Sequence, residues 1–343
     1  MARVYGIDMG TSTLKIYQKA RGIIYSERNA VAVFENKKVI AIGDEAWQME
    51  GKTPPNIEVA YPVRSGVPAD VRNMVTQLNM IFNKLSEIHG KMNGQEFMIA
   101  IPTNITEVEK RAYVELVEAC DIKPGLIRVV DKPIADALGA DVDIKEVTGT
   151  IIVDIGAETT ELSVLSNGGI VISRTLNYGG KRLDENIIAA VRKYYNFMVG
   201  AKTAEQIKIK LGSATHPEES EIKTLQVFGR KLVSGLPGSI PIDSEFVYLS
   251  IKDTLELIVD AIKAMLTHVP PEISADVMTY GIYLTGGMSS IKNFGRLVKN
   301  ITGLPVHTAE KGSESVVLGL GKIMEEKELD IFAEKYSGLQ IMD

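Results

Sequence analysis

The sequence has few of the residues that cross-link small proteins, and no segment that suggests a membrane span. Its 343 residues include one cysteine, Cys120, which excludes an intramolecular disulfide framework. No run of about 18 apolar residues occurs, so we expect no membrane-spanning helix. The 38 basic and 44 acidic residues give a net charge of −6, which argues against broad binding to nucleic acid. The four histidines are scattered, without metal-ligand spacing.

The overall composition is typical of a folded cytoplasmic protein. Hydrophobic residues make up 45% and charged residues 24% of the chain, as in ordinary globular proteins. The length predicts about two domains or lobes. Asp8 interrupts the apolar stretch that a signal peptide would need. We therefore expect a cytoplasmic location.

Short β-rich runs alternate with helical patterns, which predicts the α/β class. Apolar residues recur at helical spacing over 71–88 and over 253–266, and the second segment is followed by two prolines. Residues 97–101 and 126–130 are predicted strands. The polar segment 212–221 is a predicted loop.

Two shorter segments carry more specific predictions. Thr106 and Glu109 have the spacing of a capping box, and the helix that follows is predicted to bury a stripe that includes Val108, Leu116 and Cys120. Cys120 is therefore expected to be an inert buried thiol. The segment 322–343 is predicted to form a terminal helix and a tail.

The most informative feature is a repeated turn. Residues 4–17 and 150–165 each contain an apolar strand, then Asp-x-Gly, then small or hydroxyl residues and a second strand. A glycine turn lets successive backbone N–H groups approach a phosphate, and hydroxyl groups add donors. The carboxylates of Asp8 and Asp154 could act through Mg²⁺ and its bound waters. Two such hairpins facing each other would clamp a triphosphate between two lobes.

Two further features are compatible with a nucleotide site. The paired glycines Gly286 and Gly287 follow a predicted buried strand and would let a flat ligand approach the backbone. Glu205 and Lys208, three residues apart, share one face of a predicted helix. A plain strand-to-helix turn and a surface ion pair are the alternatives that remain open for these two features.

The order of many short motifs resembles the MreB-type bacterial actins of the actin-like ATPase superfamily, over about residues 4–322. The motifs that carry the resemblance include Gly66-Val-Pro-Ala-Asp70, Val153-Asp-Ile-Gly156, Thr203-Ala-Glu-Gln-Ile-Lys-Ile-Lys-Leu-Gly-Ser213, Leu284-Thr-Gly-Gly287 and Thr302-Gly-Leu-Pro305. The resemblance implies an actin-like α/β fold of four subdomains, with two lobes of mixed sheet and helices around a nucleotide cleft. It also implies ATP with Mg²⁺ as cofactors, and filaments that direct rod shape and cell-wall synthesis.

The resemblance assigns roles residue by residue. Asp8 and Asp154 would hold the Mg²⁺ waters. The nucleotide-binding residues implied by the matching motifs are Thr11, Ser12, Thr13, Lys15, Gly156, Ala157, Glu158, Thr159, Gly180, Asp184, Glu205, Lys208, Gly286, Gly287, Met288 and Ser289.

The chain departs from the family at the position expected to orient the attacking water. MreB-type proteins carry a glutamate immediately before the proline, whereas this chain has Lys132 before Pro133. A protonated ammonium cannot act as a base. The neighbouring Asp131 is one residue away and points in another direction. We therefore expect slow or absent hydrolysis with nucleotide binding retained.

Three further departures alter charge or space. Glu158 stands where the family has a glycine beside a phosphate. A carboxylate about 4 Å from a phosphate would cost about 4 kcal/mol at a dielectric constant near 20. We hypothesise that Lys132 pairs with Glu158 and so cancels this repulsion. Lys15 replaces an apolar residue and either restores positive charge at the first turn or is a solvated strand lysine. Met288 replaces the third glycine and is expected to narrow the base pocket.

The predicted domain organisation follows the resemblance. The first lobe would span 1–144 with an outer subdomain near 31–65, and the second lobe 145–309 with an outer subdomain near 179–240. Residues 310–330 would form a helix that returns to the first lobe, followed by a tail at 331–343.

The resemblance implies most directly that the chain assembles head to tail with copies of itself, with paired protofilaments as a further candidate arrangement. Other MreB-type proteins and membrane shape-complex proteins are further candidate partners. Direct membrane binding has weak support, because the chain begins at the first strand and the loop 90–96 has only Met92 as an apolar residue. Two alternatives stay open: a hydrolysis-deficient regulator that co-assembles with another MreB-type protein, and a small-molecule kinase of the same superfamily.

Overall fold

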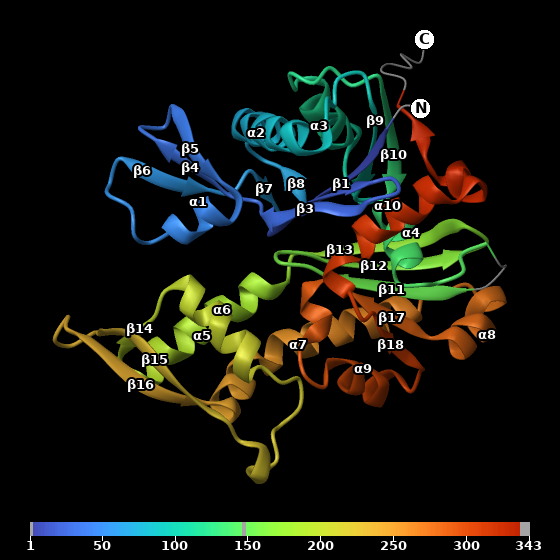
Figure 1. Cartoon of the computed structure of the whole chain (residues 1–343). Helices are drawn as coiled ribbons and strands as arrows, with labels where there is room; N and C mark the ends of the chain where they lie inside the picture. Colours follow the sequence, from blue (N-terminus) through green and yellow to red (C-terminus); the bar gives the residue numbers. More distant parts are fainter. Residues whose placement is uncertain (1–2, 146–148, 337–343) are drawn as a thin grey trace. The chain divides into compact units, whose positions relative to one another are not determined.

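The computed structural model describes residues 3–145 and 149–336, which divide into two compact units (Figure 1). Unit 1 contains residues 3–145, 167–173 and 313–336, and unit 2 contains residues 149–166 and 174–312. The predicted lobe boundaries near 145 and 310 stay predictions, although the short segment 167–173 groups with unit 1.

Unit 1 is built on a six-stranded sheet with the order β19-β10-β9-β1-β2-β3. β1 pairs antiparallel with β2 and parallel with β9, which is parallel to β10. The strands are β1 (Val4–Met9), β2 (Thr13–Gln18), β3 (Gly22–Arg28), β9 (Glu96–Ile101), β10 (Leu126–Asp131) and β19 (Glu334–Lys335). The predicted strands at 97–101 and 126–130 are therefore confirmed.

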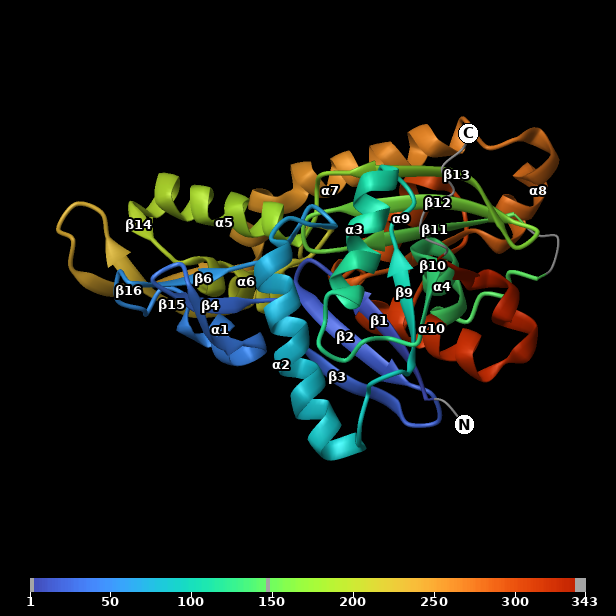
Figure 2. The ribbon, with the colours of Figure 1, turned by 90° about the horizontal axis from the view of Figure 1, so that it is seen from above.

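Helices cover both faces of this sheet (Figures 1 and 2). α2 (Val71–His89) and α3 (Glu107–Glu118) pack on one face and share its apolar core, and α4 (Lys132–Gly139) and α10 (Ser315–Glu325) lie on the other. α4 and α10 approach so closely that a Cβ on Gly319 would lie 1.7 Å from the carbonyl oxygen of Ala135. Glycine is required there because no side-chain atom fits.

A smaller part of unit 1 follows the hairpin of β2 and β3. It contains a three-stranded sheet, a short helix and a two-stranded ribbon. These elements are β4 (Val31–Phe34), β5 (Lys38–Ile42), α1 (Gly43–Met49), β6 (Ile57–Ala60), β7 (Val63–Arg64) and β8 (Val67–Pro68). Trp47 of α1 packs against the small apolar cluster of this part.

Unit 2 contains a five-stranded sheet with the order β13-β12-β11-β17-β18, flanked by helices and extended by a second, three-stranded sheet β14-β15-β16 (Figure 1). The first part of β13 groups with unit 1. The strands are β11 (Thr150–Ile155), β12 (Thr160–Ser166), β13 (Gly169–Leu176), β14 (Phe197–Met198), β15 (Thr224–Lys231), β16 (Pro237–Asp243), β17 (Ile282–Thr285) and β18 (Val306–Thr308). The helices are α5 (Gly180–Tyr195), α6 (Ala201–Leu211), α7 (Ser244–Leu266), α8 (Pro271–Tyr280) and α9 (Phe294–Thr302).

Several helix predictions are confirmed. α2 covers the predicted segment 71–88, and both hydrogen bonds of the predicted capping box form between Thr106 and Glu109 at the start of α3. Cys120 is buried, and burial raises the pKa of its thiol to about 12, as expected for an inert cysteine. The segment 212–221 is irregular apart from a short 3₁₀ turn at Glu219–Glu221.

Three details of the predictions are wrong. Val108 is 79% exposed, because the buried face of α3 is formed by Tyr113, Val114, Leu116 and Val117 instead. α7 begins at Ser244, well before the predicted residue 253, because Asp243 caps it through the backbone N–H of Phe246.

The third error concerns the end of the chain. α10 ends at Glu325, and a 3₁₀ turn, Lys327–Phe332, and the short strand β19 follow, with β19 paired to β10. Tyr336 packs against the core of unit 1. The remaining predicted tail residues, 337–343, lie outside the described residues. Within the described ranges no helix is both long and apolar enough to span a membrane.

Candidate functional site

The first predicted turn joins β1 to β2 in unit 1. Its antiparallel register places Asp8 opposite Lys15, so their side chains share one face of the hairpin. Gly10 is needed within the turn because a Cβ there would lie 2.8 Å from the carbonyl oxygen of Thr13. The chain therefore brings Asp8, Thr11, Ser12, Thr13 and Lys15 into one short loop.

Lys15 forms a buried ion pair at this turn. Its Nζ lies 3.2 Å from Oδ2 of Asp8 and donates to Oγ1 of Thr13 at 2.8 Å. Only 5% of Lys15 and 7% of Asp8 is exposed. The alternative that Lys15 is a solvated strand lysine is therefore wrong.

Two residues that the sequence did not single out also hold the first turn. Nη1 of Arg28 donates to Oγ of Ser12 at 2.8 Å, and Nδ2 of Asn29 donates to the carbonyl of Gly10 at 2.8 Å. Arg28 also lies over the ring of Trp47, 4.6 Å from its centroid. The pairing of Thr13 with Arg28 across β2 and β3 creates these contacts, and no local motif indicates it.

The second predicted turn joins β11 to β12 in unit 2. The N–H of Gly156 donates to the carbonyl of Thr159 at 2.9 Å, which closes the turn. The start of α5 packs directly on it, because the N–H of Gly180 donates to the carbonyl of Gly156 at 3.0 Å. The N–H of Lys181 donates to the carbonyl of Ala157 at 2.8 Å.

Glu158 of the second turn forms an ion pair within unit 2. The Nζ of Lys181 lies 2.5 Å from Oε1 of Glu158. Lys181 was not identified from the sequence, although its position two residues after Gly179 puts it at the start of α5. The hypothesised Lys132–Glu158 pair joins residues of different units and stays a prediction.

The predicted base-side residues of unit 2 gather around the start of α5. The buried Nζ of Lys208 donates to the carbonyl of Gly180 and to Asp184, both at 2.9 Å. Ser289 donates to the carbonyl of Gly286 at 2.8 Å, within the turn that follows β17. The structure thus brings the start of α5, Lys208 of α6 and the paired-glycine turn together within unit 2.

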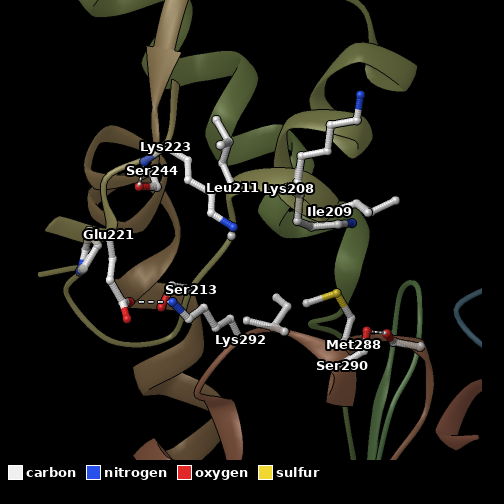
Figure 3. Close-up of a pocket in the computed structure, with 15 residues that line it drawn as sticks. Lys208, Ile209, Leu211, Ser213, Glu221, Lys223, Ser244, Met288, Ser290 and Lys292 are labelled. Carbon is white, nitrogen blue, oxygen red and sulfur yellow. Dashed lines mark hydrogen bonds and ion pairs between the residues drawn. The ribbon is translucent and has the colours of Figure 1, made fainter. Parts of the chain in front are cut away.

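A pocket of about 200 Å³ opens beside these residues (Figure 3). Met288 extends into this region toward Lys208 and Ile209, and a Cβ on Gly180 would meet its sulfur at 3.0 Å. An ion pair of 2.5 Å between Lys292 and Glu221 lies at the same pocket. Glu205 of α6 is half-buried but is not among the lining residues, so the pocket includes Lys208 without its predicted companion.

Asp131 and Lys132 stand at the junction of β10 and α4. Asp131 is the last residue of the strand and Lys132 the first of the helix, with the buried Pro133 in its first turn. Loss of surrounding water raises the pKa of Asp131, with a further contribution from Glu334, while Lys110 opposes the shift. Neither residue is the glutamate that the resemblance implies before the proline.

The described residues contain no cluster of three or more potential metal-ligating side chains. Asp8 and Asp154 are nevertheless hard oxygen donors, which suit Mg²⁺ held through water and phosphate. Gly286 leaves space beside Asp154, because a Cβ at residue 286 would lie 2.2 Å from Oδ1 of that carboxylate. Each carboxylate, taken within its own unit, is therefore chemically suited to a hydrated magnesium ion.

The fold that carries these turns is that of the actin-like proteins. The chain matches the crystal structure of MreB5 of Spiroplasma citri bound to AMPPNP with a TM-score of 0.90 and 29% identity, covering 96% of this chain and 98% of that one. It matches a MamK double helical filament structure with a TM-score of 0.77 and 22% identity, over 94% of this chain and 99% of that one, a likeness in fold alone. The predicted fold class is confirmed.

The chain belongs to the MreB/Mbl family, whose model, described as MreB/Mbl protein, matches residues 2–331. It is 35% identical to the cell shape-determining protein Mbl of Bacillus subtilis (strain 168) over 325 residues, which cover 94% of this chain and 96% of that protein. It is also 35% identical to the cell shape-determining protein MreB of Escherichia coli (strain K12) over 340 residues, 96% of each chain. The resemblance stated from the motifs is therefore confirmed.

Proposed function

We propose that this chain binds ATP with Mg²⁺, assembles with copies of itself into filaments and takes part in determining cell shape at the inner face of the cell membrane. The names of its relatives support the cell-shape role. The MreB5 structures bound to AMPPNP and to ADP support nucleotide binding. The MamK filament supports assembly through this fold.

One observation carries the nucleotide proposal: each unit contains the same Asp-x-Gly hairpin, and in each the turn is held by neighbouring elements. In unit 1 Arg28 and Asn29 hold the turn, and in unit 2 the start of α5 does. The turns would offer backbone N–H groups and hydroxyls to phosphate oxygens. The pocket beside Lys208 and Met288 would take the base and ribose side.

Each group then has a role that its chemistry allows. Bound Mg²⁺ would neutralise phosphate charge, and Asp8 and Asp154 would hold its waters. Lys181 offsets the charge of Glu158, so this carboxylate does not act on the phosphate alone. Lys208 orders the start of α5 through Gly180 and Asp184, next to the turn.

We further propose that hydrolysis is slow or absent. Lys132 stands where the family has a glutamate to orient the attacking water, and an ammonium cannot accept a proton from it. Filaments of this chain would therefore persist in the triphosphate-bound state, alone or together with another MreB-type protein.

Ultracentrifugal pelleting with ATP, with ADP and without nucleotide, combined with phosphate release in the same samples, tests both proposals. We expect nucleotide-dependent pelleting with little phosphate release. We expect Lys132→Glu to increase phosphate release, on the order of a hundredfold, the size typical of a general-base contribution.

The control for Lys132→Glu is Lys38→Glu, the same charge change at an exposed position of β5. It should leave phosphate release unchanged. Rapid release by the unmodified chain would contradict the proposal on hydrolysis. No pelleting in any condition would contradict self-assembly and favour a regulator.

A further inference from the structure

The buried Asp8–Lys15 pair has a consequence for the cation that accompanies the nucleotide. We propose that Lys15 is a built-in counter-ion of the first turn, which lets this chain hold a nucleoside triphosphate with reduced dependence on Mg²⁺. The proposal rests on the proposed nucleotide binding and specifies its cation requirement.

The first step is the electrostatic state of Asp8. A buried carboxylate next to a phosphate is repelled by it, and a divalent cation between them normally removes that repulsion. Here the ammonium of Lys15 already lies 3.2 Å from Oδ2 of Asp8, and both side chains are buried. The carboxylate charge of Asp8, which Mg²⁺ would otherwise offset, is therefore neutralised by the chain itself.

The second step is the direction of Lys15. Its Nζ also donates to Oγ1 of Thr13, a residue of the turn, at 2.8 Å. Among the described residues, Asp8 and Thr13 accept two of the three N–H donors of the ammonium, which leaves one for a phosphate oxygen. The cation is thus fixed at the turn rather than on a mobile side chain.

The third step is the comparison with the second hairpin. The position across from Asp154, equivalent to Lys15, is occupied by Glu161, which is also buried. The second hairpin thus has two carboxylates opposite each other, whereas the first hairpin has a carboxylate opposite an ammonium group. The second hairpin therefore has no lysine at the position equivalent to Lys15, so the proposal is a weakened dependence on Mg²⁺ and not its loss.

The test is the affinity for a fluorescent methylanthraniloyl derivative of AMPPNP, measured by anisotropy in excess Mg²⁺ and in EDTA. We expect removal of Mg²⁺ to weaken binding by less than about tenfold in the unmodified chain, and by about a hundredfold in Lys15→Met, as a lost charge-assisted contact predicts. Lys15→Gln keeps a donor for Asp8 without the charge and should resemble Lys15→Met.

Lys38→Met, at an exposed strand position, is the matched control and should behave as the unmodified chain. Circular dichroism and thermal unfolding show whether each variant is folded. If Lys15→Met does not fold, the loss of affinity in EDTA is compared between Lys15→Gln and the unmodified chain, and this comparison still tests the role of Lys15.

The outcomes separate the two proposals. An equally strong loss of affinity in EDTA with and without Lys15 would overturn the role of Lys15 while nucleotide binding stands. No binding by the unmodified chain, even in excess Mg²⁺, would overturn the proposed nucleotide binding itself.

Discussion

The Glu158–Lys181 ion pair shows how one side chain can make an unusual turn compatible with an anion. Glu158 puts a negative charge at the second turn, where backbone N–H groups would face phosphate. Lys181 lies 2.5 Å from it, at the start of α5, whose N-terminal end favours negative charge. The net charge at the turn is therefore close to that of an uncharged residue.

Lys181→Gln should therefore weaken nucleotide binding. The pair is partly exposed, so we expect a loss of about twofold to fivefold in affinity, in the range of exposed ion pairs. Binding of the fluorescent nucleotide in excess Mg²⁺ measures it. The double variant Glu158→Gln/Lys181→Gln should recover most of the loss, and an unchanged affinity in Lys181→Gln would show that the pair does not affect the site.

At the scale of elements, the crossing of α4 and α10 depends on glycine. A Cβ on Gly319 would lie 1.7 Å from the carbonyl oxygen of Ala135, so the helices would have to separate. Gly319→Ala should lower the free energy of unfolding by about 3 kcal/mol, at the upper end of overpacking effects. Urea unfolding measures the change.

The control for this crossing is Gly200→Ala, because a Cβ at Gly200 meets nothing within 4 Å. It should cost less than about 1 kcal/mol, as expected for a change at a helix N-cap. Equal costs for the two variants would mean that the close approach does not limit the crossing.

The capping box of α3 gives a pH-dependent prediction. The backbone N–H and the hydroxyl of Thr106 donate to the carboxylate of Glu109, and these bonds lower its pKa. A lowered folded-state pKa means that the contribution to stability is present above the unfolded-state pKa and is lost as pH falls through the folded-state value.

Glu109→Ala should therefore be destabilising near pH 7, by about 0.5 kcal/mol for an exposed capping carboxylate, and close to neutral below about pH 3. Urea unfolding of both chains across this range measures the difference. Glu107→Ala, in the same first turn, is the control, and it should show a smaller pH dependence. A pH-independent cost for Glu109→Ala would contradict the assignment.

At the scale of the whole molecule, patterns local in sequence predicted the elements well. The spacing of apolar residues identified α2, because it reflects which face of the helix is buried. The repeated Asp-x-Gly segments identified both hairpins, because each motif contains the turn and the two strands that it joins. Val108 was misplaced because several stripes of α3 are apolar, and only packing decides which one is buried.

The contacts that sequence reasoning missed at the candidate site are tertiary. Arg28 reaches the first turn through the pairing of β2 with β3, and Lys181 reaches the second turn because α5 packs on it. Lys15 was identified as a candidate, but its burial and its pairing with Asp8 depend on the register of the β1–β2 hairpin and on what covers it. Such contacts have no fixed spacing along the chain, so no motif indicates them.

The position of Arg28 between Ser12 and Trp47 has an optical consequence. Trp47 is the only tryptophan of the chain, and the guanidinium that covers its ring also donates to the first turn. A ligand that engages Ser12 would shift Arg28 and so change the emission of Trp47.

We expect nucleotide addition to change the tryptophan fluorescence with the same concentration dependence as the anisotropy signal, and Arg28→Leu to abolish the change. An emission that does not respond while the anisotropy signal does would show that Arg28 stays in place. If the tryptophan emission follows the anisotropy signal, the protein contains its own spectroscopic reporter, and occupancy of the site can be followed without a label.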